Sequence, residues 1–273
     1  MACACFTFLE DTIRGYYGPA IVLSFFAGFM NTILSNFMNA SFSLPALTLA
    51  FNFVMLSFLG GINTDNIEVV NLKPIVSESV DTSMSFWFMI DAIFRGVGQF
   101  IFADTTLGGL LIIIGITIAS RPSALSVVLG SFLACISTLY ILQIPDSLIA
   151  DVRRGLYGYN TAGVFAAISG NVFYVFNISS IFYGFIGSFL SILILVSFKT
   201  FFGLSEWNLP VMTVPFCLTT WLMMYLRAPA LIPLDQRNAP ARHTVRGLKQ
   251  STYLDNSMHS YLDESQHSSA SKF

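Results

Sequence analysis

Long apolar stretches constrain what this chain can fold into more than any motif does. They lie at 16–38, 44–60, 107–120, 124–144, 161–176, 180–198 and 209–228. A helix needs about 20 apolar residues to cross the hydrocarbon of a bilayer. Charged residues make up only 10% of the chain and hydrophobic residues 55%, whereas a soluble domain carries about 25% charged residues. The sequence therefore predicts an all-α, polytopic integral membrane protein with the lipid bilayer as its solvent.

Charge, histidine and cysteine usage exclude several classes of function. The formal net charge is −2 and no basic stripe runs through the apolar part, so nucleic acid is not a predicted partner. All three histidines lie at or beyond His243, which leaves no imidazole in the apolar stretches for acid–base chemistry or metal binding. The four cysteines lack metal-ligand spacing, and Cys135 and Cys217 are interpreted as small core residues. We therefore predict no enzyme, no cofactor and no metal site.

An internal repeat joins two distant parts of the chain. FSLPALTLAF at 42–51 aligns with WNLPVMTVPF at 207–216, with four identities in ten positions. The offset is 165 residues (213 − 48) and pairs Thr48 with Thr213. Because many transport folds are duplications with the solute path between the copies, this LPxxT motif is a candidate part of such a path.

The repeat also predicts the domain organisation. At the same offset RGVGQFIF and GLYGYN have no first-copy partners within the sequence, so we expect the front part of the first repeat to be missing. Residues 1–60 then hold the C-terminal part of the first repeat, and 61–85 form a polar linker. Residues 86–228 form a complete second repeat, a pore helix followed by about five spans. The tail at 229–273 is rich in Ser, Gln, Asn and His, which predicts disorder.

The distribution of charge predicts the orientation of the chain in the membrane. Lysine and arginine favour the cytoplasmic side, and the tail carries Arg237, Arg242, Arg246, Lys249 and Lys272. The acidic linker lies an odd number of predicted spans away, so we expect it to be extracellular. The prediction is a multi-pass plasma-membrane protein with a cytoplasmic C-terminal tail.

The two prolines of LPVMTVPF have different predicted roles. Pro210 suits the first turn of a helix, where its missing N–H costs nothing. Pro215 in a continuing helix would leave the carbonyl of Val211 without a donor, next to the hydroxyl of Thr213. The first copy has Ala50 in place of Pro215. The alternative is a simple kink whose carbonyl is satisfied by a neighbouring helix.

Two other segments carry polar residues that are expensive in a membrane. Gln99 lies in an apolar strip and should bond to backbone or face a polar path. Asn160 begins an apolar helix and most simply caps it. The stretch 86–103 has Asp91 and Arg95 four residues apart, an ion pair on one helix face. This stretch is predicted to be interfacial or re-entrant rather than spanning.

These candidate groups are amides, carbonyls and hydroxyls, with aromatic rings close by in the sequence. Such a path suits a small, neutral, planar, polar solute and does not suit an ion or a proton.

The same motifs resemble those of the urea transporter (urea channel) family, in the family's order and spacing. The similarity covers about 16–228 and is carried by RGVGQFIF with the acidic loop and Gly-Gly (95–109), RRGLYGYN (153–160), LPALTLAFN (44–52) and LPVMTVPFC (209–217). The resemblance implies two inverted homologous halves, each with five spanning helices and a tilted pore helix. It also implies homotrimers with one pore per protomer, in which urea slides between phenylalanine-lined slots.

The resemblance further implies roles for particular residues. Gln99 corresponds to a site glutamine and Phe102 to a slot ring. Thr213 corresponds to a hydroxyl at the central constriction of the pore, and Thr48 is its equivalent in the first half.

Other positions shape or alter this pattern. Leu209 and Pro210 correspond to the second pore-forming turn. Family members usually have Val directly after the glutamine, where this chain has Phe100, which would narrow the slot. The glutamine and slot phenylalanine of the first half have no counterpart in this sequence.

The leading prediction is passive, channel-like transport of urea down its gradient. The alternative is a transport-inactive truncated subunit that assembles with full-length protomers. A third hypothesis is a related pore for ammonia, water or formamide.

Overall fold

Helices build the part of the chain that the computed structural model describes, residues 17–62, 85–145, 148–204, 210–226 and 228–234. Extended pairing within these ranges is limited to one antiparallel bridge between Tyr174 and Pro233, so the predicted all-α class is confirmed. The elements are α2 (Tyr17–Phe42), α3 (Leu49–Ile62), α4 (Phe86–Gly98), η1 (Gln99–Ile101), α5 (Thr106–Ala119), α6 (Arg121–Ile136), η2 (Ser137–Ile141), α7 (Ile149–Arg153), α8 (Gly158–Ser169), α9 (Ile178–Leu204) and α10 (Val214–Tyr225).

The length and composition of the helices suit a membrane. Among the described residues, three helices are long and apolar enough to cross it, at Ile21–Phe42, Arg121–Ile141 and Ile178–Phe201. A fourth candidate is the pair Phe86–Ile101 and Thr106–Ala119, which is bent by 71°. A broken span and a re-entrant loop both fit this bend, so the prediction that 86–103 is interfacial or re-entrant stays a prediction. The predicted division into repeats and spans stays a prediction.

Hydroxyl caps begin both helices of this bent pair. The Ser85 hydroxyl accepts from the backbone N of Phe88 (3.2 Å) at the start of α4, and the Thr105 hydroxyl accepts from the N of Gly108 (3.1 Å) at the start of α5. Each cap satisfies one of the first N–H groups of a helix, which have no partner within the helix. The cap at Thr105 lies at the bend and determines where α5 begins.

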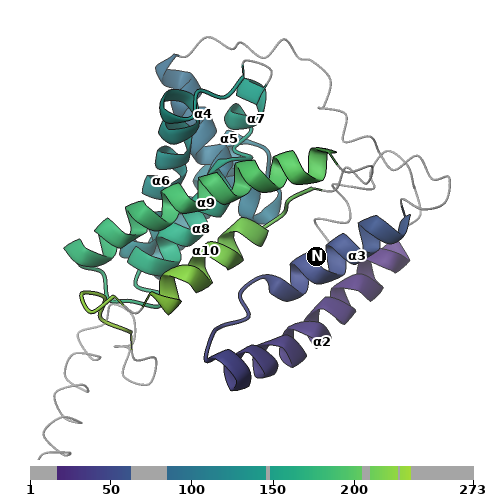
Figure 1. Cartoon of the computed structure of the whole chain (residues 1–273). Coiled ribbons are helices and arrows are strands. Elements are labelled where there is room, and N and C mark those ends of the chain that lie inside the picture. Colours follow the sequence, from purple (N-terminus) through teal and green to yellow (C-terminus); the bar gives the residue numbers. More distant parts are fainter. Residues whose placement is uncertain (1–16, 63–84, 146–147, 205–209, 227, 235–273) are drawn as a thin grey trace, which may run out of the picture.

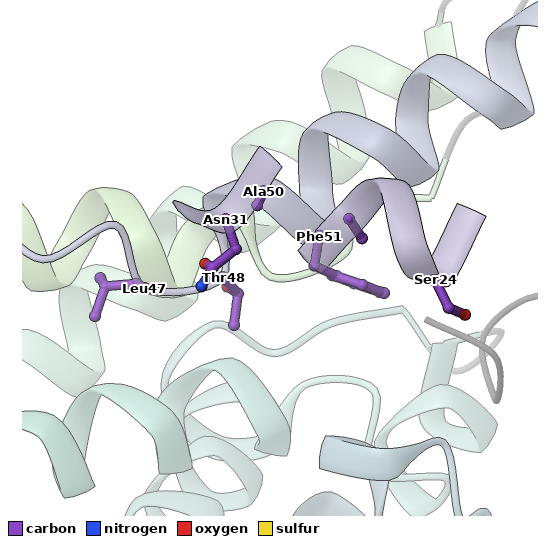
Figure 2. Close-up of a pocket in the computed structure, with 7 residues that line it drawn as sticks. Ser24, Asn31, Leu47, Thr48, Ala50 and Phe51 are labelled. Carbon is purple, nitrogen blue, oxygen red and sulfur yellow. The ribbon is translucent and has the colours of Figure 1, made fainter. Parts of the chain in front are cut away.

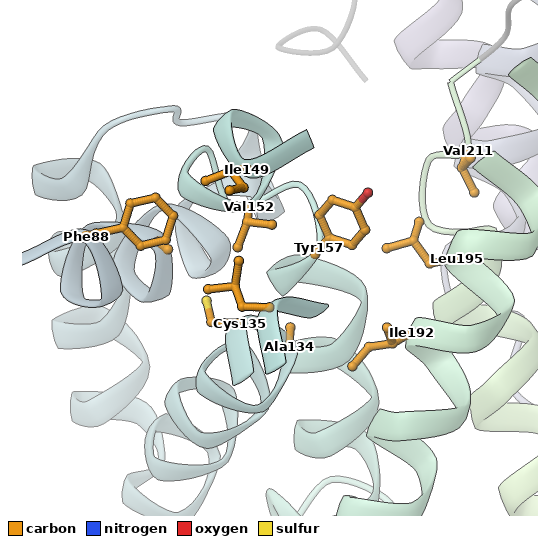
Figure 3. Packing of buried hydrophobic residues seen from close by; sticks show 11 residues of the cluster. Phe88, Ala134, Cys135, Ile149, Val152, Tyr157, Ile192, Leu195 and Val211 are labelled. Carbon is orange, nitrogen blue, oxygen red and sulfur yellow. The ribbon is translucent and has the colours of Figure 1, made fainter. Parts of the chain in front are cut away.

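One apolar cluster holds α4, α6, α7, α8 and α9 together (Figure 3). Tyr157 and Phe88 are its largest members, and Ile192 and Leu195 from α9 belong to it on the side of Tyr157. Val211, just before α10, belongs to the same cluster. Cys135 is buried here as a free thiol, as predicted. The cluster thus links the segment before α10 to the main group of helices.

Glycines let the two motifs RGVGQFIF and RRGLYGYN cross in close contact. A Cβ on Gly155 would lie 2.2 Å from the backbone N of Gly96, and one on Gly158 would lie 2.9 Å from the Cα of Gly96. Gly155 also has φ +76°, a conformation that side chains disfavour. Small residues allow this kind of backbone approach between membrane helices. The crossing places the end of α4 beside the start of α8.

α2 and α3 form a hairpin that lies beside α10 (Figure 1). The indole Nε1 of Trp221 on α10 donates to the carbonyl of Pro45 (2.8 Å) in the turn of the hairpin. Leu44 and Ala46 are buried in the same contact. The turn that carries the first LPxxT motif is therefore fixed against the helix that follows the second.

The segment after α10 folds back on the chain. The backbone N of Val175 donates to the carbonyl of Ile232 (2.9 Å), and the N of Leu234 donates to the carbonyl of Phe173 (2.8 Å). The prediction that the disordered tail begins at residue 229 is thus wrong for 229–234, which pair with the α8–α9 connection. Most of the predicted linker (63–84) and the tail from 235 lie outside the described residues.

Candidate functional site

The two LPxxT motifs have the same local conformation. Leu47 and Met212, which are equivalent in the repeat, have φ values of 54° and 52°. One residue later lie Thr48 and Thr213, and the helix begins directly after each threonine, α3 at Leu49 and α10 at Val214. The left-handed residue makes a tight turn directly before each threonine.

The threonines of the two motifs meet. Thr48 Oγ1 lies 2.7 Å from Thr213 Oγ1, within hydrogen-bond distance. The Asn52 Oδ1 accepts from both the backbone N (3.1 Å) and the hydroxyl (2.9 Å) of Thr213. Cys217 Sγ lies 3.2 Å from Thr48 Oγ1 and accepts from Asn52 Nδ2 at 3.7 Å. We call these four residues the threonine cluster.

The threonine cluster is only partly accessible. Asn52 and Cys217 are 3% and 2% exposed, whereas Thr48 and Thr213 are half-buried. The two threonines are therefore the more accessible members of the cluster.

The structure corrects the predicted roles of the prolines. Pro210 lies before α10 rather than in its first turn, and Pro215 is in the first turn, where a missing N–H costs nothing. The Val211 carbonyl accepts from the N of Val214 (3.5 Å). The prediction that Pro215 opens this carbonyl is wrong, because the helix begins four residues later than Pro210. Leu209 lies outside the described residues.

Side chains donate hydrogen bonds to the next carbonyl along the chain, that of Met212. The Met212 carbonyl accepts from the hydroxyl of Tyr159 (2.5 Å) and from Nδ2 of Asn160 (3.1 Å). Both donors come from the first turn of α8. The turn before Thr213 is thus fixed by the GLYGYN motif.

Asn160 caps a helix, but a different one from the helix that was predicted. α8 has no side-chain cap at its start, and Asn160 Oδ1 instead accepts from the backbone N of Phe216 (3.1 Å) in the first turn of α10. Both ends of the amide are therefore bonded to the second LPxxT segment. Because Asn160 is fully buried, it fixes the position of that segment rather than facing a solute.

Gln99 ends α4 and bonds to backbone. Its Nε2 donates to the carbonyl of Arg154 (2.9 Å), in the motif that crosses α4. The half-buried amide keeps Oε1 as an acceptor. Phe102 has φ 59°, so the chain turns sharply three residues after Gln99. The Phe100 side chain, between them, is 37% exposed.

An aromatic contact relates this region to the threonine cluster. The rings of Phe102 and Phe51 have centroids 6.0 Å apart at an angle of 48°. Phe51 lies in the first turn of α3, three residues after Thr48. Phe102, three residues after Gln99, thus contacts the first LPxxT motif through Phe51.

An open pocket of about 490 Å³ lies against the first motif. Figure 2 shows its lining, which comes from α2 and from the turn into α3: Ser24, Ala27, Asn31, Leu47, Thr48, Ala50 and Phe51. None of these residues is charged. Thr48 therefore belongs both to the pocket and to the threonine cluster.

The charged side chains pair at the ends of α4 and α7. Asp91 accepts from Arg95 Nε and Arg153 Nε, each at 2.9 Å, and from the hydroxyl of Thr106. The predicted Asp91–Arg95 pair is confirmed. Lys199 pairs with Asp151 at 3.1 Å. Among the residues that the structure describes, no three His, Cys, Asp or Glu side chains gather as a metal site would require.

Sequence reasoning missed Asn52, Cys217 and Tyr159. Asn52 and Cys217 are equivalent in the repeat, each four residues after the threonine of its copy. Residues four apart share a helix face, so extending the alignment by one residue would have placed both beside the threonines. Nothing in the sequence indicates that Tyr159 reaches the turn before α10.

The chain resembles known proteins over most of its length. The family model described as "Urea transporter" matches residues 1–228. "Urea transporter 1" of Ovis aries is 32% identical over 152 residues, which is 51% of this chain and 34% of the sheep protein. The protein of the same name from Mus musculus is 28% identical over 183 residues, covering 62% of this chain and 41% of the mouse protein. The aligned part thus spans between a third and two-fifths of these relatives.

Proposed function

Because the chain belongs to the urea transporter family, we propose that it carries urea across the membrane by passive, channel-like permeation down its gradient. The observation that carries the proposal is the contact of Thr48 and Thr213, 2.7 Å apart, beside an uncharged pocket that Thr48 lines. A polar point in an apolar surrounding stabilises a solute that makes hydrogen bonds. A neutral solute such as urea needs no counter-charge there.

The side chains near the pocket fit a flat amide. Phe51 and Phe102 supply aromatic rings, whose centroids lie 6.0 Å apart. The hydroxyls of the threonine cluster supply oxygen atoms. Gln99 keeps its Oε1 as an acceptor because its Nε2 is bonded to Arg154. We assign Gln99, Phe102, Thr48 and Thr213 to the solute path, and Val211, Met212 and Asn160 to the scaffold that holds Thr213.

The proposal extends to the setting of the protein. We place it in the plasma membrane with the basic C-terminal tail in the cytoplasm, because lysine and arginine favour that side. The homotrimeric assembly implied by the family resemblance is part of the same proposal. The selectivity for urea over ammonia, water and formamide is a further part that flux measurements can resolve.

Urea flux into proteoliposomes of this chain tests the proposal. After a urea gradient is applied, we expect vesicle volume to recover faster than in empty liposomes, and the rate to be independent of proton or sodium gradients. Gln99→Leu should slow the recovery, since it removes the Oε1 acceptor. Flux no greater than that of empty liposomes would overturn the proposal. Flux that appeared only after a full-length protein of the family was added would instead favour the alternative of a transport-inactive subunit that assembles with full-length protomers.

A further inference from the structure

The orientation of the Asn52 amide is fixed by a backbone donor. The Thr213 N–H can only donate, and it lies 3.1 Å from Asn52 Oδ1. That atom of the amide must therefore be the oxygen, and the other is the NH₂ group. Asn52 Nδ2 then donates to Cys217 Sγ at 3.7 Å.

The hydroxyl protons of the cluster follow from this assignment. The Thr213 hydroxyl, 2.9 Å from Asn52 Oδ1, must donate its one proton to that oxygen. In the contact of 2.7 Å between the threonines, Thr48 is then the donor. Since the Thr48 proton is used in this way, the contact of 3.2 Å between Thr48 and Cys217 requires the thiol S–H to donate.

The four hydrogen bonds close a ring that runs in one direction, from Asn52 to Cys217, to Thr48, to Thr213 and back to Asn52. Bonds in such a chain polarise and strengthen one another where the local dielectric is low. Asn52 and Cys217 are 3% and 2% exposed, so water does not compete for their side of the ring.

We propose that Asn52 and Cys217 are positioning residues that close this ring, so that the Thr48 and Thr213 hydroxyls present only hydrogen-bond acceptors to a permeating solute with N–H donors. Each hydroxyl oxygen has two lone pairs. One accepts within the ring and one is left over, while both protons are committed. The solute half of this proposal rests on the proposed function, and the ring itself does not.

An acceptor-only surface determines which solutes are stabilised. An amide N–H finds a partner at each threonine, whereas an anion or a solute without donors does not. Gln99 also offers an acceptor, its Oε1, although its Nε2 uses only one of its two N–H groups on the Arg154 carbonyl. All three polar groups of the proposed path thus have an acceptor for the N–H groups of a solute.

Infrared spectroscopy tests the ring without any transport measurement. The full chain with Cys3, Cys5 and Cys135 replaced by alanine leaves Cys217 as its one thiol. A thiol that donates a hydrogen bond has its S–H stretching band at lower frequency. We expect Thr48→Val to move this band to higher frequency, and Thr48→Ser, which keeps a hydroxyl, to leave it low. Thr138→Val, which removes a buried hydroxyl bonded to Ala134, should not move it. A band that is the same in the parent and in Thr48→Val would overturn the ring.

Urea flux tests the consequence for the solute. Cys217→Ala removes the S–H donor that holds the Thr48 hydroxyl oxygen in place, so we expect flux to fall about three- to tenfold, the effect of one neutral hydrogen bond. Cys217→Ser restores a donor and should recover most of the flux. Cys135→Ala, at a buried cysteine of the apolar cluster, is the matched control and should be neutral.

The two measurements separate the possible failures. A low S–H band together with equal flux in Cys217→Ala and the parent would overturn the role of the ring in orienting the solute. A parent protein without urea flux would overturn the proposed function, while the band shift would still decide whether the ring exists.

Discussion

Thr48 and Thr213 occupy the same position in two copies of one motif, and their hydroxyl oxygens lie 2.7 Å apart. The contacts around them are reciprocal. Asn52 of the first copy contacts Thr213, and its equivalent Cys217 of the second copy contacts Thr48. Reciprocal contacts of this kind are the mark of a two-fold relationship. These contacts are what a local two-fold relationship between the two motifs would produce.

We predict that Thr213→Val lowers urea flux without unfolding the protein. Valine keeps the shape of threonine and removes its hydroxyl, so Thr48 loses its acceptor and the solute loses one oxygen. Asn52 still accepts from the backbone N of residue 213, which limits the loss of stability to about 1 kcal/mol. Flux in proteoliposomes and the melting temperature in detergent measure the two effects.

The matched control is Thr161→Val in α8. Thr161 is fully buried, and its hydroxyl donates to the carbonyl of Tyr157 (3.2 Å), so this variant also loses one buried hydroxyl. It should leave flux unchanged. If both variants transport urea at the parent rate, Thr213 has no part in the solute path.

Local sequence rules predicted the fold class and the Asp91–Arg95 pair. Composition decides whether lipid is the solvent, and spacing along one helix decides an i,i+4 pair. The equivalence of Thr48 and Thr213 follows from comparing two segments, but their contact was not predicted. These features need no knowledge of how distant segments pack.

The rest depends on contacts between segments far apart in the sequence. Asn160 was expected to cap its own helix because the nearest orphan N–H groups are there. The structure shows it bonded to Phe216, 56 residues away. The roles of Pro210 and Pro215 changed because a left-handed residue, Met212, delays the start of α10. A shift of one turn in a helix start removes the expected cost of Pro215, and sequence rules place such boundaries poorly.

We predict that Asn160→Ala destabilises the protein by about 1–3 kcal/mol, because the buried N–H of Phe216 loses its acceptor. Tyr159→Phe should cost less, since the Met212 carbonyl keeps its bond from Asn160. Thermal unfolding in detergent measures both. Asn177→Ala removes an ordinary helix cap, at the N of Ser180 (2.7 Å), and serves as the control. Equal flux and stability in Asn160→Ala and Asn177→Ala would contradict a scaffold role for Asn160.

We predict that Asp91→Asn loosens the bend between α4 and α5. The carboxylate holds Arg95, Arg153 and Thr106 together, and asparagine cannot neutralise two guanidinium groups. The two arginine side chains are 28% and 31% exposed, so solvent screening reduces the cost below that of a fully buried pair, to about 1–3 kcal/mol.

Limited proteolysis and the melting temperature follow the loss at Asp91. Asp151→Asn, which breaks only the pair with Lys199, should cost less than about 1 kcal/mol. A melting temperature for Asp91→Asn equal to that of Asp151→Asn would show that Asp91 does not organise the bend.

We predict that Gly155→Ala prevents the crossing of the two motifs. The new Cβ would lie 2.2 Å from the backbone N of Gly96, and backbone atoms cannot move aside as a flexible side chain can. The φ of +76° adds about 1–2 kcal/mol for a non-glycine residue, on top of about 1–3 kcal/mol for overpacking. Since the Arg154 carbonyl binds Gln99, we expect both the folded fraction and the urea flux of that fraction to fall.

Gly115→Ala, with nothing within 4 Å, should be neutral or slightly stabilising. Size-exclusion profiles in detergent and flux per folded protein compare the two, and a Gly155→Ala protein that matches Gly115→Ala in both would show that the close crossing is not needed.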